Sequence, residues 1–313
     1  MENKRVLVTG GAGFIGSHLV EQLVMDGATV TVVDDLSSGS MDNLVHVGDQ
    51  IDLRVLNICK SGLDQVVVEQ EYDVIFHLAA NAYVPPSVER PAWDYEINLR
   101  STFRLLEILR RSEWPGVLVY VSSAAVYGDP VRMPIHEEDP TVPISPYGVG
   151  KLSAERYVAV YSQLYGLRAA SVRLFSVYGP RQRKQVVYDL IGKIRRDPSR
   201  LFIHGDGTQV RDFNYVEDTA RAMMLVAERA PLQGKVYNVA SGQECSIGEL
   251  AEKLCGILGV QPRFVYSGAV RPGDPEKWSV NLDRLEALGY RAQVSLDDGL
   301  EQTVAWHHEY ARL

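Results

Sequence analysis

A tyrosine and a lysine stand four residues apart at the start of a predicted helix. Tyr147 and Lys151 follow Pro146, so the phenol and the ammonium would share one helical face. An ordinary tyrosine has a pKa of about 10, and lowering it toward 7 requires about 4 kcal/mol of phenolate stabilisation, part of which an adjacent ammonium could supply. Tyr147 could then accept the proton of a substrate hydroxyl while hydride leaves the same carbon. The alternative is an exposed helical pair without chemistry.

Ser123 is expected beside this pair. It follows the apolar run 117–121 and would lie at the C-terminal end of a strand, the edge at which open α/β sheets bind ligands. A hydroxyl at that edge can share or relay the proton taken by Tyr147. The alternative is a strand-end serine whose hydroxyl bonds only to the backbone.

A glycine turn near the N-terminus predicts a dinucleotide site. Gly10, Gly13 and Gly16 stand between a short apolar strand and a helix, and Asp34 ends the next predicted strand. The glycines suit a tight turn, close approach of a diphosphate and close helix packing, while the helix N-terminus offers N–H donors. A carboxylate at position 34 would accept from the adenosine ribose hydroxyls and repel a 2′-phosphate, so NAD is favoured over NADP. The alternative is a glycine turn that binds nothing.

A sheet is needed to bring these residues together. Buried-type strands are predicted over residues 6–8, 29–33, 74–78, 117–121 and 169–174, with helices such as 99–111 and 150–165 between them. This alternation predicts an α/β fold, a Rossmann-type doubly wound parallel sheet.

The pattern loosens after about residue 175, which predicts a smaller interleaved α/β substrate lobe. We expect the NAD-binding Rossmann domain to comprise residues 1–175 plus about 212–240, and the nucleotide-sugar-binding lobe to comprise 176–211 and 241–313. Residues 246–249 have the spacing of a capping box, which predicts a helix running to about Leu258.

Together these motifs closely resemble the extended short-chain dehydrogenase/reductase family, and within it the nucleotide-sugar 4-epimerases of the UDP-glucose 4-epimerase type. The resemblance covers nearly the whole chain, through segments 9–16, 77–80, 122–128, 145–151, 173–181, 205–218 and 271–274. It implies a catalytic triad of Ser123, Tyr147 and Lys151, a bound NAD, and a homodimer formed through helices 99–111 and 150–165. The residues that the resemblance assigns to the NAD site are Gly10, Gly13, Phe14, Ile15, Gly16, Asp34, Asp35, Ser38, Gly39, Asn57, Ile58, Leu78, Ala79, Ala80, Asn98, Lys151 and Phe175.

The two residues after Ser123 discriminate within this family. Relatives that dehydrate the sugar or decarboxylate uronic acids usually carry an acidic residue where this chain has Ala124 and Ala125. Because alanine cannot transfer a proton, a 4-keto intermediate has no side-chain acid or base for elimination at this position. The outcome that remains is return of hydride to the opposite face of the intermediate. The sequence therefore predicts NAD-dependent epimerisation at C4 of a nucleotide-activated hexose, with UDP-glucose/UDP-galactose or the uronic equivalents as substrates. A 4,6-dehydratase, a 4-ketosugar reductase and a non-catalytic NAD-binding protein are the alternatives.

The resemblance also implies a substrate side. Arg181, Arg211 and Arg271 align with positions near the nucleotide diphosphate, where guanidinium groups suit phosphate oxygens. Trp278 aligns with a position whose bulk limits room for an N-acetyl group on C2; its alternative is a packing aromatic. The other expected substrate contacts are Val84, Ser123, Tyr147 and Ser176, the last standing where the family commonly has asparagine. A basic stretch is expected to be a solvated face, or else to hold a partner for a uronic carboxylate: Arg183, Lys184, Arg195 and Arg196.

Composition excludes several other classes. The chain has 313 residues, 46% hydrophobic and 23% charged, which fits a globular enzyme-sized protein and excludes a disordered or collagenous chain. A formal net charge of -8 argues against a surface made for nucleic acid or anionic lipid. The three cysteines are widely spaced, so we expect no metal site and a reducing cytoplasm. We expect no signal peptide, because residues 1–5 lead straight into a predicted strand and leave no room for an apolar h-region. We expect no membrane span, because no apolar run nears the required length of about 20 residues.

Overall fold

A seven-stranded parallel sheet forms the centre of the larger part of the protein. The computed structural model describes residues 1–60, 62–268 and 277–310. The strand order is β10-β6-β5-β4-β1-β2-β3. In chain order the strands are β1 (Arg5–Thr9), β2 (Thr29–Asp34), β3 (Ile51–Val55), β4 (Val74–His77), β5 (Val117–Ser123), β6 (Arg168–Leu174) and β10 (Gln233–Val239). The predicted fold class is confirmed, and all neighbouring strands of this sheet run parallel.

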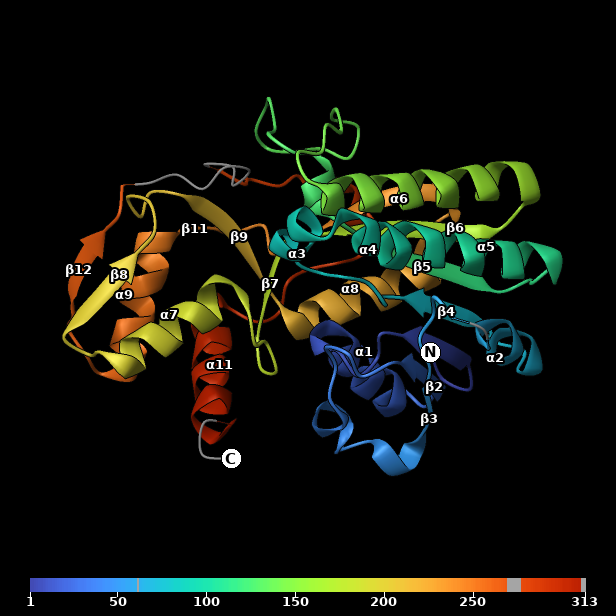
Figure 1. The fold of residues 1–313 in the computed structure, drawn as a ribbon, viewed down its shortest axis with the longest axis horizontal. Coiled ribbons are helices and arrows are strands. Elements are labelled where there is room, and N and C mark those ends of the chain that lie inside the picture. The colour runs from blue at the N-terminus through green and yellow to red at the C-terminus, as the bar shows by residue number, and fades with distance from the viewer. Residues whose placement is uncertain (61, 269–276, 311–313) are drawn as a thin grey trace.

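Helices cover both faces of this sheet (Figure 1). Helices α1 (Phe14–Met25) and α8 (Val216–Arg229) pack on one face, against side chains such as Val6 and Val8. The opposite face is covered by α2 (Leu63–Glu69), α5 (Ser101–Arg111) and α6 (Pro146–Tyr165) and includes Leu7. Because successive strand residues point to opposite faces, the continuous apolar run at 6–8 fills both cores at once.

The short elements between β4 and α5 pack against the helix that carries Tyr147 and Lys151. They are α3 (Val84–Glu89), α4 (Pro91–Tyr95) and a π-helix, Glu96–Arg100, that continues into α5. Helix α6 begins at Pro146, as predicted, and the side chain of its N-cap residue Ser145 accepts a hydrogen bond from Gly148 N. Helix α4 and the π-helix both pack against α6.

A smaller lobe lies beside the C-terminal ends of the strands (Figure 1). It contains a three-stranded sheet, β11-β9-β7, and a two-stranded sheet, β12-β8. Its strands are β7 (Ser176–Tyr178), β8 (Arg200–Ile203), β9 (Val210–Tyr215), β11 (Glu244–Ser246) and β12 (Arg263–Tyr266), and its helices are α7 (Gln185–Arg196), α9 (Ile247–Leu258) and α11 (Leu296–Tyr310). The short helix α10 (Asp283–Glu286) packs instead against β10 of the large sheet. The predicted capping box is confirmed, since Ser246 and Glu249 bond reciprocally at the start of α9. The exact domain limits given above stay a prediction.

Two further features concern apolar helices and cysteines. Among the residues that the structure describes, no helix is both long and apolar enough to cross a membrane. The three cysteines are free thiols, with Cys245 and Cys255 buried and Cys59 partly buried.

Candidate active site

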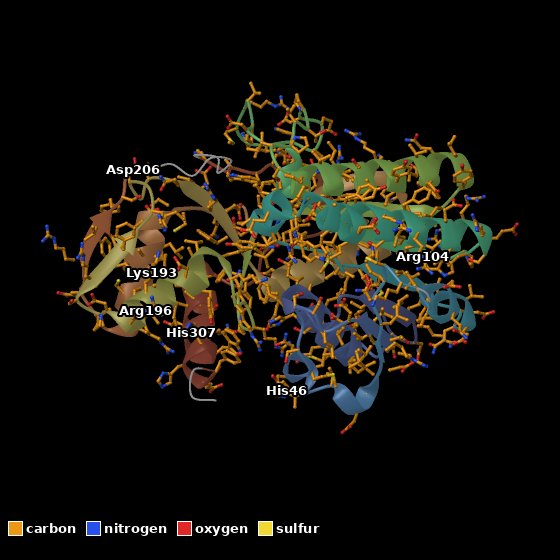
Figure 2. The ribbon with its side chains drawn as sticks, in the orientation of Figure 1. His46, Arg104, Lys193, Arg196, Asp206 and His307 are labelled. Atoms are coloured by element: carbon orange, nitrogen blue, oxygen red, sulfur yellow. The ribbon has the colours of Figure 1, made fainter. Side chains whose placement is uncertain are left out.

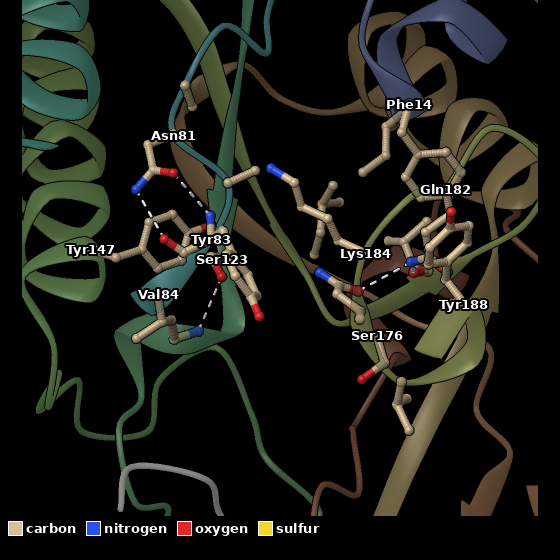
Figure 3. A pocket seen from close by; sticks show the side chains of 18 of the residues that line it. Phe14, Asn81, Tyr83, Val84, Ser123, Tyr147, Ser176, Gln182, Lys184 and Tyr188 are labelled. Carbon is tan, nitrogen blue, oxygen red and sulfur yellow. Dashed lines mark hydrogen bonds between the residues drawn. The ribbon is translucent and has the colours of Figure 1, made fainter. Parts of the chain in front are cut away.

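A cleft of about 1700 Å³ runs along the C-terminal edge of the large sheet and continues under the smaller lobe. Residues at or directly after the ends of β1, β2, β3, β4, β5 and β6 contribute to it, and so does helix α7 of the smaller lobe. Figure 3 shows Tyr147, Ser123, Asn81 and Tyr83 on one side of this space and Lys184, Gln182 and Tyr188 on the other. The cleft is therefore long enough to connect the glycine turn with the predicted catalytic residues.

The glycine turn fits a diphosphate. A Cβ on Gly16 would lie 2.1 Å from Gly10 O, and one on Gly10 would lie 2.7 Å from Ala79 N, so side chains are excluded where the turn meets the helix. Helix α1 begins at Phe14, and its N-cap residue Gly13 provides no side-chain acceptor. The first N–H groups of α1 therefore face the cleft with the positive end of the helix dipole behind them.

The end of β2 fits an adenosine ribose. Asp34 accepts hydrogen bonds from Ala12 N at 3.0 Å and from Leu36 N at 2.9 Å, which fixes both carboxylate oxygens at the cleft wall. Burial raises the pKa of Asp34, while these two N–H donors act in the opposite direction. Asn57 donates to Asp35 at 2.7 Å, which places the neighbouring acid at the same end.

Most of the residues predicted for the NAD site line this cleft, and two do not. Gly39 packs against the turn, since a Cβ there would lie 2.8 Å from Ala12 O. Asn98 is buried behind the wall, where its amide donates to Asp94 Oδ1 at 2.8 Å. Those that line the cleft are Gly10, Gly13, Phe14, Ile15, Gly16, Asp34, Asp35, Ser38, Asn57, Ile58, Leu78, Ala79, Ala80, Lys151 and Phe175.

The predicted triad comes together at the middle of the cleft. Ser123 ends β5, and Tyr147 and Lys151 lie on the first two turns of α6, where both are buried and line the cleft. Lys151 Nζ donates to Val121 O at 2.9 Å and lies 5.2 Å from the centre of the Tyr120 ring. The Ser123 hydroxyl accepts a hydrogen bond from Ala125 N at 3.2 Å, which holds it at the strand end.

Burial dominates the protonation of this group. It raises the pKa of Tyr147 to about 12, with the Ser123 hydroxyl acting in the opposite direction and Asp94 adding to the rise. Burial also lowers the pKa of Lys151 to about 8, while Asp94 acts in the opposite direction. The sequence led us to expect Lys151 to lower the pKa of Tyr147, whereas in the protein alone burial raises it.

The side chains that line the cleft directly after Ser123 in the chain are small and apolar. Ala124 and Ala125 begin a 3-10 helix, Ala124–Val126, and both line the cleft. Trp278 also lines it and packs edge-on against Phe175, with ring centres 5.1 Å apart. Its place at the cleft agrees with a residue that limits room for the ligand, and its contact with Phe175 agrees with a packing aromatic. Val84 and Ser176 lie at the same space.

The three predicted arginines lie in different settings. Arg181 lines the cleft, but its guanidinium donates to Ser17 Oγ at 3.1 Å and to Glu21 at 2.5 Å on helix α1. It therefore joins the smaller lobe to the glycine-turn helix. Arg211 lines the cleft and donates to Val210 O at 2.8 Å. Arg271 lies outside the described residues.

Part of the basic stretch belongs to the cleft. Arg183, Lys184 and Arg196 line it, whereas Arg195 bonds to His307 of α11. Lys184 Nζ lies 5.7 Å from the centre of the Tyr83 ring, across the cleft from α7 (Figure 3). Figure 2 shows Lys193 and Arg196 in the smaller lobe, well apart from Arg104 on helix α5.

Sequence reasoning missed Asn81, Tyr83 and Asp94. Asn81 and Tyr83 line the cleft, and Asn81 donates to Asp94 at 2.7 Å. Asp94 stands between Trp93 and Tyr95, and no local pattern marks its carboxylate as buried, because its burial arises from tertiary packing.

The described residues contain no group of three or more histidines, cysteines or acids placed to hold a metal ion.

Comparison with known proteins defines the class. Residues 6–240 match the NAD dependent epimerase/dehydratase family, and the chain belongs to it. A UDP-glucose 4-epimerase of Mycolicibacterium smegmatis is 36% identical over 308 residues, which cover 96% of this chain and 97% of that protein.

Two solved structures are closely similar. A UDP-N-acetylglucosamine 4-epimerase from Methanobrevibacter ruminantium, in complex with UDP-N-acetylmuramic acid, has a TM-score of 0.92 at 33% identity, over 99% of this chain and 100% of that chain. The UDP-glucuronic acid 4-epimerase from Bacillus cereus, in complex with UDP-glucuronic acid and NAD, has a TM-score of 0.89 at 30% identity, over 98% and 99%. The predictions of the family, of an isomerase acting on a nucleotide sugar, and of NAD as its cofactor are confirmed by these matches.

Proposed function

We propose that this chain interconverts the C4 epimers of a UDP-sugar and that Ser123, Tyr147 and Lys151 carry the proton chemistry. The observation that supports this most is the pair of alanines beside these residues. In the described lining of the cleft, the carboxylates are Asp34 and Asp35 at the adenosine end and Asp189 and Asp206 from the smaller lobe. A sugar at Ser123 would therefore meet methyl groups where elimination needs an acid or a base.

Each member of the triad has a distinct part in this proposal. Bound NAD supplies the acceptor and donor of hydride. Tyr147 takes the proton of the C4 hydroxyl as that carbon is oxidised, and returns it when the carbonyl is reduced from the opposite face. Ser123 shares this proton through its hydroxyl. Lys151, anchored by Val121 O, keeps a positive charge beside the phenolate in a site where burial alone disfavours it.

The nucleotide and the sugar of the substrate are proposed from different observations. The three relatives described above are named for different sugars, which vary at C2 and C6, and all three names share UDP and C4. We therefore take UDP as the nucleotide. For the sugar we propose glucose/galactose or the uronic equivalents. This is supported by Trp278, which packs on Phe175 and lines the cleft, where its bulk would narrow the room near C2.

Two incubations test the activity. The purified protein is mixed separately with UDP-glucose and with UDP-galactose, and the products are followed by proton NMR. One common mixture from both sides is expected, without net NADH formation. Loss of water or carbon dioxide from the sugar, with no exchange at C4 in a panel that includes UDP-glucuronate, would overturn the proposal.

A substitution at Trp278 tests the sugar preference. Trp278→Ala should raise the kcat/KM for UDP-N-acetylglucosamine relative to UDP-glucose by about tenfold, because one to two kcal/mol of steric exclusion is removed. The Trp306→Ala variant, in helix α11, is the matched control and should leave this ratio unchanged. An unchanged ratio for Trp278→Ala would assign Trp278 to packing.

We also propose that the protein is a cytoplasmic homodimer that pairs through α5 and α6. The outer face of these helices exposes Phe103, Tyr157, Val160, Leu164 and Tyr165, a group of apolar side chains that supports an interface. The three free thiols support a reducing compartment. Sedimentation analysis should give a dimer for the wild type and a monomer for Leu164→Glu; a wild-type monomer would remove the proposal.

A further inference from the structure

Asp94 is a buried acid beneath the catalytic helix. Its side chain lies on α4 and is 1% exposed. Oδ1 accepts two hydrogen bonds, from the amides of Asn81 at 2.7 Å and Asn98 at 2.8 Å. Oδ2 is also buried and has no hydrogen-bond partner among the described residues. Two neutral amides hold this carboxylate in place, and one of its oxygens remains available to a positive group.

The unpartnered oxygen faces helix α6. A Cβ on Gly150 would lie 3.5 Å from Asp94 Oδ2 and 3.3 Å from the Asn98 side chain, so α4 and the π-helix approach α6 at the residue that precedes Lys151. Asp94 acts electrostatically on both Tyr147 and Lys151. The absence of a side chain at position 150 is what allows this approach.

The other titratable groups around this point are neutral, paired or exposed to solvent. From β4, His77 is held neutral because burial lowers its pKa to about 3, and from β5, burial raises the pKa of Tyr120 well above its ordinary value. From α6, Glu155 is paired with Arg173 of β6. From the π-helix, Glu96 and Arg100 pair with each other at the surface. From α3, Glu89 is exposed.

We propose that Asp94 is a positioning residue of the active site, whose carboxylate is the buried counter-charge that keeps Lys151 an ammonium next to Tyr147. This rests on the proposed roles of Tyr147 and Lys151. A buried charge without an opposite charge is strongly unfavourable, and each of these two ions reduces that cost for the other. Asn81 and Asn98 hold the Asp94 carboxylate in place. The close packing at Gly150 sets how near this carboxylate lies to helix α6.

The negative charge of Asp94 raises the pKa of two groups, Lys151 and Tyr147. A nearby negative charge favours the protonated form of both the lysine and the tyrosine. Removing it should let Lys151 lose its proton at lower pH, and should also let Tyr147 lose its proton at lower pH. The two limbs of the pH–kcat profile report this pair of groups, and because both pKa values fall, both limbs should move toward lower pH together.

The Asp94→Asn variant tests this on the NAD-loaded enzyme. Both limbs are expected to move by about one pH unit, the effect of a unit charge at several ångströms in a site of intermediate dielectric. A profile that is lowered in height with both limbs in place would show a merely structural role and overturn the proposal.

A second readout needs neither turnover nor cofactor. In protein labelled with 13C at the lysine ε-carbons, the Lys151 signal is assigned by its loss in Lys151→Met, and its titration midpoint is followed by NMR. The midpoint is expected near 8 in the wild type and lower in Asp94→Asn. An unshifted midpoint would overturn the proposal. If the protein instead proves inactive on every nucleotide sugar, this measurement still decides the role of Asp94.

Matched variants separate charge from structure. Asp218→Asn replaces another fully buried acid, on α8, which accepts bonds from Gln293 N and Val294 N; it should lower stability and leave the Lys151 midpoint unchanged. Asp94→Glu keeps the charge and should keep both limbs in place, also where Asp94→Asn fails to fold. Displaced limbs in a folded Asp94→Glu protein would contradict the proposal.

Discussion

Arg173 and Glu155 form a two-pronged ion pair in the interior of the large domain. Arg173 Nε lies 2.9 Å from Glu155 Oε2 and Nη2 lies 2.6 Å from Oε1, and both side chains are almost fully buried. The pair joins β6 to α6, two turns beyond Tyr147. Arg173 also donates to Glu137 O at 3.1 Å and lies over the Tyr127 ring. The helix that carries Tyr147 is thereby fixed to the sheet.

Removing one partner of this pair should destabilise the fold. Glu155→Gln leaves the Arg173 guanidinium buried without an opposite charge, and the expected loss is about 3–5 kcal/mol of unfolding free energy. Urea unfolding followed by circular dichroism measures it. Glu96→Gln, which removes a surface pair with Arg100, is the control and should change stability by less than about 1 kcal/mol. Equal effects of the two substitutions would show that burial of the ion pair is unimportant.

Tyr147→Phe should abolish most of the activity and leave NAD binding intact. Removal of the proton-transferring hydroxyl is expected to lower kcat by about 10²–10⁴-fold, the usual contribution of general acid–base catalysis. The measurement is initial-rate kinetics together with the NAD content of the purified variant. Tyr157→Phe changes an exposed tyrosine on the same helix and should keep wild-type kcat. A fully active Tyr147→Phe protein would exclude Tyr147 as the base.

Gly16→Ala should prevent NAD binding. The added methyl would lie 2.1 Å from Gly10 O and 2.8 Å from Gly11 Cα, so the turn and helix α1 have to separate. Calorimetric titration with NAD is expected to show at least a hundredfold weaker binding. Gly256→Ala, in helix α9, has open space around the new methyl and is the matched control. It should bind NAD normally and gain up to about 1 kcal/mol of stability. Normal NAD affinity in Gly16→Ala would place the diphosphate elsewhere.

His18 should make the fold sensitive to acid. Burial lowers its pKa to about 4, helped by the Arg181 charge, while a bond to Pro180 O opposes this. The unfolded chain takes up this proton near pH 6.5 and the folded chain only near pH 4, so stability falls as the pH drops through this window. At pH 4.5 the loss is about 2–3 kcal/mol.

Thermal unfolding at pH 7 and pH 4.5 measures the effect of His18. His18→Gln should lose less stability between these two values than the wild type does, because the substituted side chain takes up no proton. His46→Gln replaces an exposed histidine (Figure 2) and should behave as the wild type. Identical acid sensitivity of His18→Gln and the wild type would show that His18 does not cause it.

The sequence predicted the parts of this protein that local patterns encode. Buried parallel strands appear as continuous apolar runs, and the glycine turn and the Tyr147–Lys151 spacing are local as well. Strand β3 was not predicted, because the predicted strands were continuous apolar runs. This edge strand instead alternates apolar and polar residues. Arg181 was expected at a phosphate, and its pairing with Glu21 depends on how two distant segments meet. The same reason hid Asp94, whose partners Asn81 and Asn98 come from separate elements.

The methyl groups of Ala124 and Ala125 also bear on the thermodynamics of the proposed reaction. When no water or carbon dioxide departs, substrate and product differ only in the configuration of one carbon, and their free energies are nearly equal. Such a catalyst imposes no direction. The net flux through it then follows whichever epimer neighbouring enzymes supply or withdraw, so two small side chains beside Ser123 leave the control of flow to the rest of metabolism.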